Sequence, residues 1–150
     1  MAFAALALAL AAGCGGNGGG GDALTAAELR EQADAICAEY NQRVQDVPEP
    51  EGIDDLPQYI DEVLPVIEEG QEKLRDLEPP QELEADWNQA MTLNERNLGF
   101  IRELRDAAEE NDEERAQQLF QQLGETETGS DRLARKLGLE ECGAESASGR

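Results

Sequence analysis

The residues best suited to chemistry in this sequence are three cysteines, Cys14, Cys37 and Cys142. Cys14 follows an apolar Ala/Leu run that ends in small residues, and glycines follow it. This pattern is typical of a signal peptide that is cleaved before an acylated cysteine. We therefore expect residues 1–13 to be a lipoprotein signal peptide and residues 14–23 to be the lipidated cysteine with a glycine-rich tether. The apolar run of about a dozen residues is too short to span a membrane, which takes ~20.

Export would leave Cys37 and Cys142 in an oxidising compartment, where such a pair forms a disulfide. We expect the last helix to end at Leu137, with Gly138 in the left-handed conformation and Leu139 packed back on the last turn. The chain beyond it could then climb ~16 Å, about the height of Cys37 along the first helix. A redox-active pair is the alternative, although no CxxC arrangement accompanies it.

Polar residues interrupt two of the apolar helical stripes, at Asn94 in one and at Thr126 and Ser130 in the other. An up-down bundle places these three residues opposite one another. They form a candidate polar core layer, which either fixes the register of the helices through hydrogen bonds or lines a pocket for a small molecule.

The sequence offers few residues that are suited to catalysis or to metal binding. The chain has no histidine, which excludes the usual serine and cysteine triads, carboxylate-histidine di-iron bundles and histidine-bearing zinc sites. Its 34 carboxylates single out no acid-base pair. The acidic run at residues 109–114 lacks the glycine and spacing of an EF-hand loop. We expect no catalytic residue, no cofactor and no metal.

The net charge of −22 limits the kinds of partner that the protein can bind. Nucleic acid is excluded because a polyanion would be repelled. An anionic lipid surface would be repelled too, so contact with the membrane should come from the lipid anchor. A protein of the cell envelope is the expected macromolecular partner, and the oligomeric state stays open.

Apolar residues recur at helical spacing in four segments between residues 24 and 143. The predicted fold is an all-α, antiparallel up-down four-helix bundle with one disulfide, followed by a disordered tail at residues 144–150. The expected helices cover about residues 25–46, 55–77, 81–110 and 112–137.

Local signals refine these elements. Thr25 and Glu28 match a capping box at the start of the first helix. Pro65 lies inside the second helix, where we expect a kink without a stop. Gly70 lies on the apolar stripe of the same helix, and a hairpin about Pro79-Pro80 would bring Trp87 level with it. We expect the indole to fill the notch at Gly70.

Three segments, at residues 35–41, 77–80 and 137–143, together resemble a group of uncharacterised secreted or lipid-anchored helical proteins of GC-rich Gram-positive bacteria. The resemblance spans about residues 28–143. It implies the helical fold, the link between Cys37 and Cys142 and an extracytoplasmic address. It implies no activity.

The sequence therefore predicts a membrane-anchored binding or structural module of the cell envelope that is not an enzyme. A bundle that binds a small ligand or a divalent cation is the first alternative. A carboxylate-based hydrolase of envelope polymers is the second. A cavity of more than ~300 Å³ at the level of Asn94 would favour the ligand-binding alternative, and a filled core would favour a protein partner.

Overall fold

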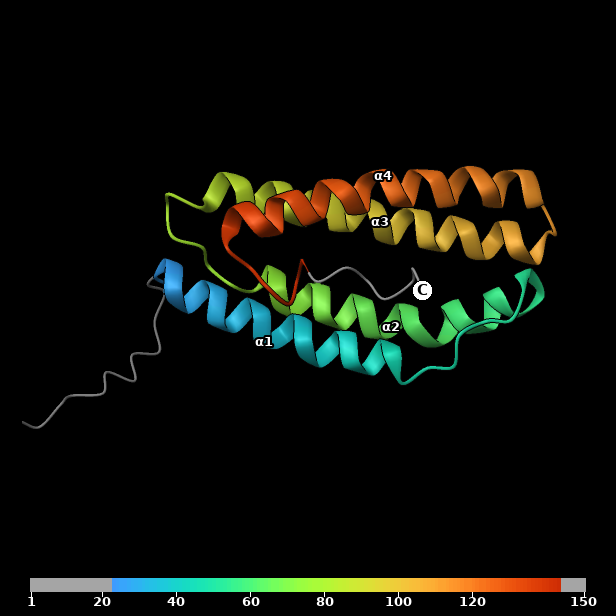
Figure 1. Cartoon of the computed structure of the whole chain (residues 1–150), viewed down its shortest axis with the longest axis horizontal. Coiled ribbons are helices and arrows are strands. Elements are labelled where there is room, and N and C mark those ends of the chain that lie inside the picture. The colour runs from blue at the N-terminus through green and yellow to red at the C-terminus, as the bar shows by residue number, and fades with distance from the viewer. Residues whose placement is uncertain (1–22, 144–150) are drawn as a thin grey trace, which may run out of the picture.

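A computed structural model describes residues 23–143, and these fold into helices with no strand among them (Figure 1). The all-α, four-helix part of the predicted fold is confirmed. The predicted signal peptide, lipidated Cys14 and tail at residues 144–150 lie outside the described residues. No helix within residues 23–143 combines the length and the apolar character needed to cross a membrane. The helices are α1 (Ala26–Gln45), α2 (Leu56–Arg75), α3 (Glu84–Glu109) and α4 (Glu113–Leu137), with a 3-10 turn at Ile53–Asp55 before α2.

Side-chain and backbone caps fix the ends of the first and last helices. The Thr25 hydroxyl accepts a hydrogen bond from the Glu28 amide (3.3 Å), and the Glu28 carboxylate accepts one from the Thr25 amide (2.9 Å), so the predicted capping box is present. Gly138 ends α4 in the left-handed conformation with φ of 78°. The Leu139 amide then donates to the Ala134 carbonyl (2.9 Å), which closes the last turn as predicted.

Two proline features shape α2 and α3. Pro65 lies inside a continuous α2, so the expectation that the helix passes through it is confirmed. α3 begins at Glu84, about one turn later than expected, because residues 81–83 form a turn in which the Leu83 amide donates to the Pro80 carbonyl (2.9 Å). The connection between α2 and α3 is therefore longer than a tight proline hairpin.

This longer connection overturns the predicted pairing of Trp87 with Gly70. Tyr40 of α1 covers Gly70, and a Cβ atom added there would lie 2.8 Å from Tyr40 Cγ. Trp87 is buried in an apolar cluster with Leu29 and Leu74. The notch at Gly70 does accommodate a bulky ring, but the ring comes from α1.

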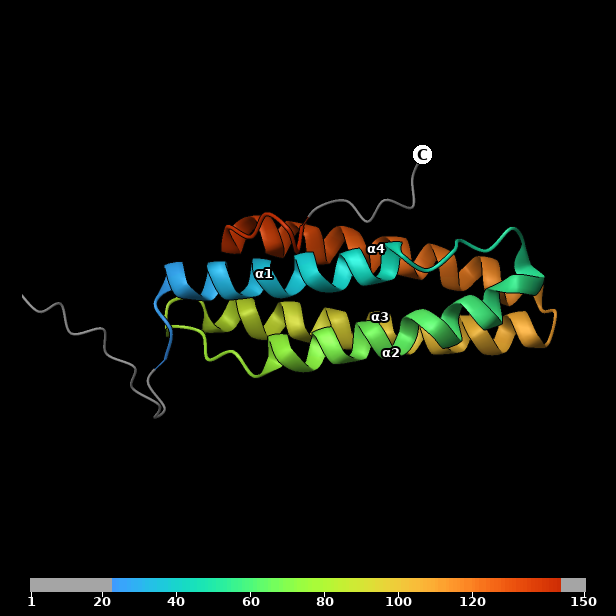
Figure 2. The same cartoon turned by 90° about the horizontal axis from the view of Figure 1, so that it is seen from below.

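α1 does not run the full length of the molecule. Figures 1 and 2 show that it stops well short of the end at which α2 begins, and residues 46–52 continue along the remaining length. Two separate apolar cores result. The first core joins all four helices and consists of Leu29, Ala33, Leu74, Trp87, Ala90, Leu133, Ala134, Leu137 and Leu139. The second core contains no residue of α1 and consists of Leu56, Ile60, Leu104, Ala107, Ala108, Ala116, Leu119 and Leu123.

The chain after α4 returns along α1 and is fastened there. A disulfide joins Cys37 and Cys142, with the Cα atoms 5.1 Å apart, as predicted. The Asp34 carboxylate accepts hydrogen bonds from three successive backbone amides of this segment, those of Glu140 (3.0 Å), Glu141 (2.9 Å) and Cys142 (3.4 Å). We call residues 138–143 the return segment.

Candidate functional site: a cavity between the two cores

A cavity of about 460 Å³ lies between the two apolar cores and is partly open to solvent. It is lined by residues of all four helices and of the return segment. α1 packs chiefly on α2, and α3 on α4, whereas contact between α1 and α4 is sparse.

Much of the cavity wall is apolar. Its aliphatic and aromatic side chains include Ile36, Tyr40, Ile67, Leu98, Ile101 and Leu123. Tyr40 and Leu98 are buried, whereas Ile36, Ile67 and Ile101 keep partial exposure because the space beside them is unfilled. Such a surface favours an organic molecule over water, since covering it releases ordered solvent.

Tyr40 is held in the wall by polar contacts on its outer side. Its hydroxyl donates to Glu69 Oε1 (2.7 Å), and the cations of Arg43 and Lys73 lie 4.7 and 5.0 Å from the ring centroid. These contacts, the Tyr40 hydrogen bond first and the Arg43 guanidinium second, hold the pKa of the Glu69 carboxyl below its usual value. The ring is therefore fixed against Gly70 and forms a rigid part of the wall.

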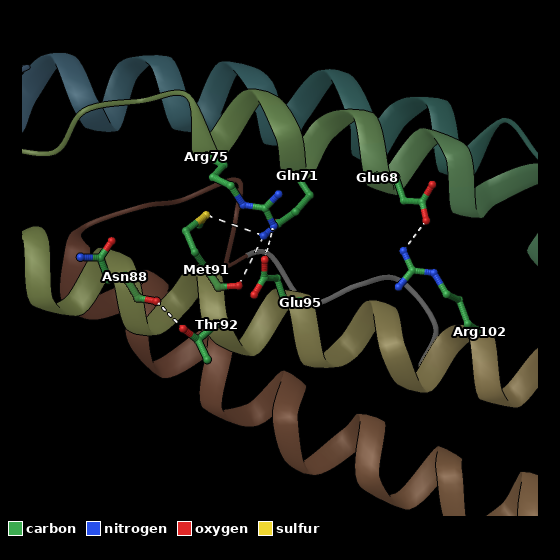
Figure 3. Close-up of polar contacts among 8 residues, drawn as sticks. All are labelled: Glu68, Gln71, Arg75, Asn88, Met91, Thr92, Glu95 and Arg102. Carbon is green, nitrogen blue, oxygen red and sulfur yellow. Dashed lines mark hydrogen bonds and ion pairs between the residues drawn. The ribbon is translucent and has the colours of Figure 1, made fainter. Parts of the chain in front are cut away.

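Gln71 and Asn97 are two of the side-chain amides that line the cavity. Gln71 is only 5% exposed, and its Nε2 donates to the Met91 carbonyl oxygen (3.4 Å), as Figure 3 shows. The ion pairs of Arg75 with Glu95 and of Arg102 with Glu68 flank this contact on the outer surface. They help to hold α2 and α3 together beside the cavity.

Asn97 is the second of these amides. Its Oδ1 atom is buried and has no hydrogen-bond partner within the part of the chain that the structure describes. A buried acceptor without a partner is uncommon, because removing it from water costs about 1–3 kcal/mol. Asn97 lines the cavity, so a bound molecule could supply the missing donor.

The structure brings together two of the three residues of the candidate polar layer. The Ser130 hydroxyl donates to Asn94 Oδ1 (3.4 Å), and both residues line the cavity. Thr126 turns elsewhere: its hydroxyl bonds to the carbonyl oxygens of Gln122 and Leu123 (2.9 Å each) in its own helix. Thr126 is not part of the cavity wall.

The charged residues of the wall are all acidic, namely Glu127, Asp131 and Glu141. The cavity partly removes the Glu127 carboxyl from water, although the residue keeps contact with solvent, and Asp131 adds a like charge. Both effects, burial first, raise the pKa of Glu127 above its usual value. The negatively charged form of Glu127 is therefore less favourable in the folded protein than in the unfolded chain.

A second hollow of about 640 Å³ lies over the connection between α2 and α3, next to Trp87. Most of its lining side chains, such as Arg75, Glu84 and Glu95, are exposed to solvent. It is a surface depression that encloses little. Within residues 23–143, no group of three or more His, Cys, Asp or Glu side chains is arranged to hold a metal ion.

Sequence reasoning identified Asn94 and Ser130 but not Gln71, Asn97 or Glu127. Asn97 follows Asn94 by three residues on the same helix, so the pair already placed two amides on one face. The acidic residues carried no such signal, because carboxylates occur on every exposed face of this chain.

No family model, curated protein or solved structure matches the chain.

Proposed function

We propose that this protein binds a small organic ligand in the cavity between its two apolar cores. The observation that carries the proposal is the buried, unpartnered Asn97 Oδ1 in a cavity of about 460 Å³. Ligand sites typically measure about 300–1,000 Å³ and combine apolar walls with a few polar groups that orient the ligand. The cavity meets both criteria, and its volume exceeds the threshold of ~300 Å³ set above.

Binding is favoured over hydrolysis by the placement of the carboxylates. Glu127 and Asp131 are one turn apart on α4 and present their side chains to the same side of the cavity. Hydrolysis of a glycosidic bond by two carboxylates requires them to flank the scissile bond. The arrangement therefore favours binding over hydrolysis of a glycosidic bond by this pair of carboxylates.

We further propose that the protein is extracytoplasmic and anchored to the membrane through a lipid on Cys14. The small residues before Cys14 and the glycines after it support the anchor, and the Cys37–Cys142 disulfide is typical of an oxidising compartment. A partner protein of the envelope would then deliver or receive the ligand. Mass spectrometry of the mature protein tests the anchor, because an unmodified Cys14 contradicts it.

An antiparallel up-down order of the helices belongs to the same proposal. The Leu24 amide, before α1, donates to the Glu78 carbonyl, after α2 (2.9 Å). Arg30 Nε, near the start of α1, donates to the Leu137 carbonyl at the end of α4 (2.7 Å). Each contact places the start of α1 beside the end of another helix, α2 in the first case and α4 in the second. This is the arrangement expected when α1 runs antiparallel to both of them.

The binding proposal is tested by calorimetric titration of 4-phenylbutan-1-ol, a small neutral aromatic alcohol, into the full-length chain with Cys14→Ser. We expect saturable binding with one site. Ser130→Leu, which fills the cavity, should weaken binding about tenfold or more. Thr128→Leu, on the exposed side of the same helix, should bind like the parent. Absence of binding to the parent, or equal loss in the two variants, contradicts the proposal.

A further inference from the structure

Within residues 23–143, the buried polar atom of the cavity that lacks a partner is a hydrogen-bond acceptor, and the three carboxylates of the wall are acceptors too. Asn97 Oδ1 has no donor, and the carboxylates of Glu127, Asp131 and Glu141 form no ion pair among the residues that the structure describes. Elsewhere on the surface carboxylates do find cations, as Asp61 does with Arg105. A ligand that completes this cavity must therefore supply donors.

The charge of the wall points to the sign of the ligand. Among residues 23–143, no lysine or arginine lines the cavity, and the whole chain carries a net charge of −22. An anionic ligand would meet only like charges, whereas a cation would be concentrated by the field of the protein and stabilised at the wall.

The apolar part of the wall separates an organic cation from a metal ion. Calcium takes six to eight oxygen ligands and magnesium keeps most of its water shell, so neither ion would cover side chains such as Ile67, Leu98 and Ile101. An apolar body with a single protonated amine would cover these side chains. Its N–H groups would supply donors to the acceptors around them.

We propose that the ligand is an organic cation, an apolar body that ends in a protonated amine, with Glu127 and Asp131 as its counter-charges. This inference rests on the proposed ligand-binding function. Asn97 Oδ1 accepts a further hydrogen bond from the ligand, which satisfies the acceptor left open in the free protein. The rigid wall at Tyr40 and the apolar residues opposite it contact the body of the ligand.

The test compares three probes of similar size at pH 7: 4-phenylbutylamine, 4-phenylbutan-1-ol and 4-phenylbutyrate. Titration calorimetry on the full-length chain with Cys14→Ser should show the amine binding about tenfold or more tighter than the alcohol, with the carboxylate weakest. Glu127→Gln should reduce the preference for the amine over the alcohol about fivefold or more. Glu125→Gln, which removes a charge from α4 outside the cavity, should have little effect.

The outcomes separate the two proposals. If the alcohol binds and the amine binds no better, the cavity takes a ligand but the cationic class is wrong. Tighter binding of the carboxylate also overturns the inference. If none of the probes binds, the proposed function itself fails. Equal weakening of the amine by Glu127→Gln and Glu125→Gln would show a general effect of protein charge and would contradict the assigned role of Glu127. Circular dichroism checks that each variant is folded.

Discussion

At the scale of single residues, the contact of Tyr40 with Gly70 sets one wall of the cavity. The position of Gly70 on the apolar stripe of the second helix correctly predicted that a bulky group presses on it. A glycine in the middle of a helix costs about 1 kcal/mol relative to alanine, and close contact with a bulky group explains why the smaller residue is present. The identity of that group depends on the register between helices. The register in turn depends on the path of residues 76–83, which local propensity does not determine.

Substitution of Gly70 by alanine should destabilise the protein. The added methyl group would lie 2.8 Å from Tyr40 Cγ, and the ring is held by its bond to Glu69, so relief requires displacement of a buried side chain. We expect a net loss of about 1–2 kcal/mol in the free energy of unfolding, measured with urea. The matched control is Gly99→Ala in α3, where nothing lies within 4 Å of the added atom; it should gain up to about 1 kcal/mol. A stabilised Gly70→Ala variant would contradict the contact.

Glu127 should make stability depend on pH in a recognisable direction. Because the pKa of this carboxyl is raised in the folded protein, its contribution to stability is present below the unfolded pKa and is lost as pH rises through the folded pKa. Glu127→Gln mimics the protonated form. It should therefore raise Tm at pH 7, and the gain over the parent should shrink at pH 4.

The same residue faces other titrating groups, which the comparison must hold constant. Asp131 on α4, Glu141 on the return segment and Tyr40 on α1 line the same cavity. Since all of them are present in both proteins, the difference in Tm reports the Glu127 charge together with its repulsion of Asp131. An unchanged or lowered Tm at pH 7 would show that the Glu127 charge is not disfavoured in the folded state.

At the scale of elements, the helix ends were the features most predictable from sequence. The Thr25 and Glu28 capping box and the left-handed Gly138 act within one or two turns, so neighbouring residues determine them. The end of α1 was predictable as well, because Val47 and Pro48 stop the helix there. Its consequence, a second core without α1 and a cavity between the cores, required the packing of the other helices.

The cysteine pair predicted that the return segment is fastened to α1, but no local signal predicted that Asp34 would hold it as well. Asp34 acts as a cap for three amides more than a hundred residues away. Asp34→Ala should cost about 1–2 kcal/mol of unfolding free energy. Hydrogen exchange offers a more selective measurement, since the amides of Glu140 and Glu141 should lose protection.

The control for this variant is Glu31→Ala, which removes an exposed carboxylate about one turn earlier on α1. It should leave the protection of the return segment intact. If Asp34→Ala leaves exchange at Glu140 and Glu141 unchanged, the carboxylate does not hold this segment. The disulfide and the hydrogen bond from Asn41 Nδ2 to the Glu141 carbonyl would then fasten it.

At the scale of the whole molecule, the disulfide closes the chain across the cavity. Cys37 and Cys142 are separated by 105 residues in sequence, and both line the cavity. The pair was predictable from cysteine count and expected export. Its place in the wall of a site was not, because that depends on how far the two cores hold the helices apart.

Removal of the disulfide should therefore act on stability and on ligand binding together. The double variant Cys37→Ser with Cys142→Ser should lose about 3–5 kcal/mol, as expected for the opening of a loop of about a hundred residues. Thermal melts measure the loss, with Cys14→Ser as the control that should leave Tm unchanged. An unchanged Tm in the double variant would contradict a structural role for the bridge. Retention of full 4-phenylbutan-1-ol affinity would show that the bridge does not shape the wall.

Occupation of the space between the two cores by a small molecule can be observed at the side chains that line it. The most direct test is to record the side-chain amide signals of Asn94, Asn97 and Gln71 by ¹H–¹⁵N NMR while 4-phenylbutylamine is added to the full-length chain with Cys14→Ser. We predict that these three signals shift most and saturate together, with the largest change at Asn97. Saturable binding that leaves them unmoved, or that shifts only signals of the hollow beside Trp87, would contradict binding between the two cores.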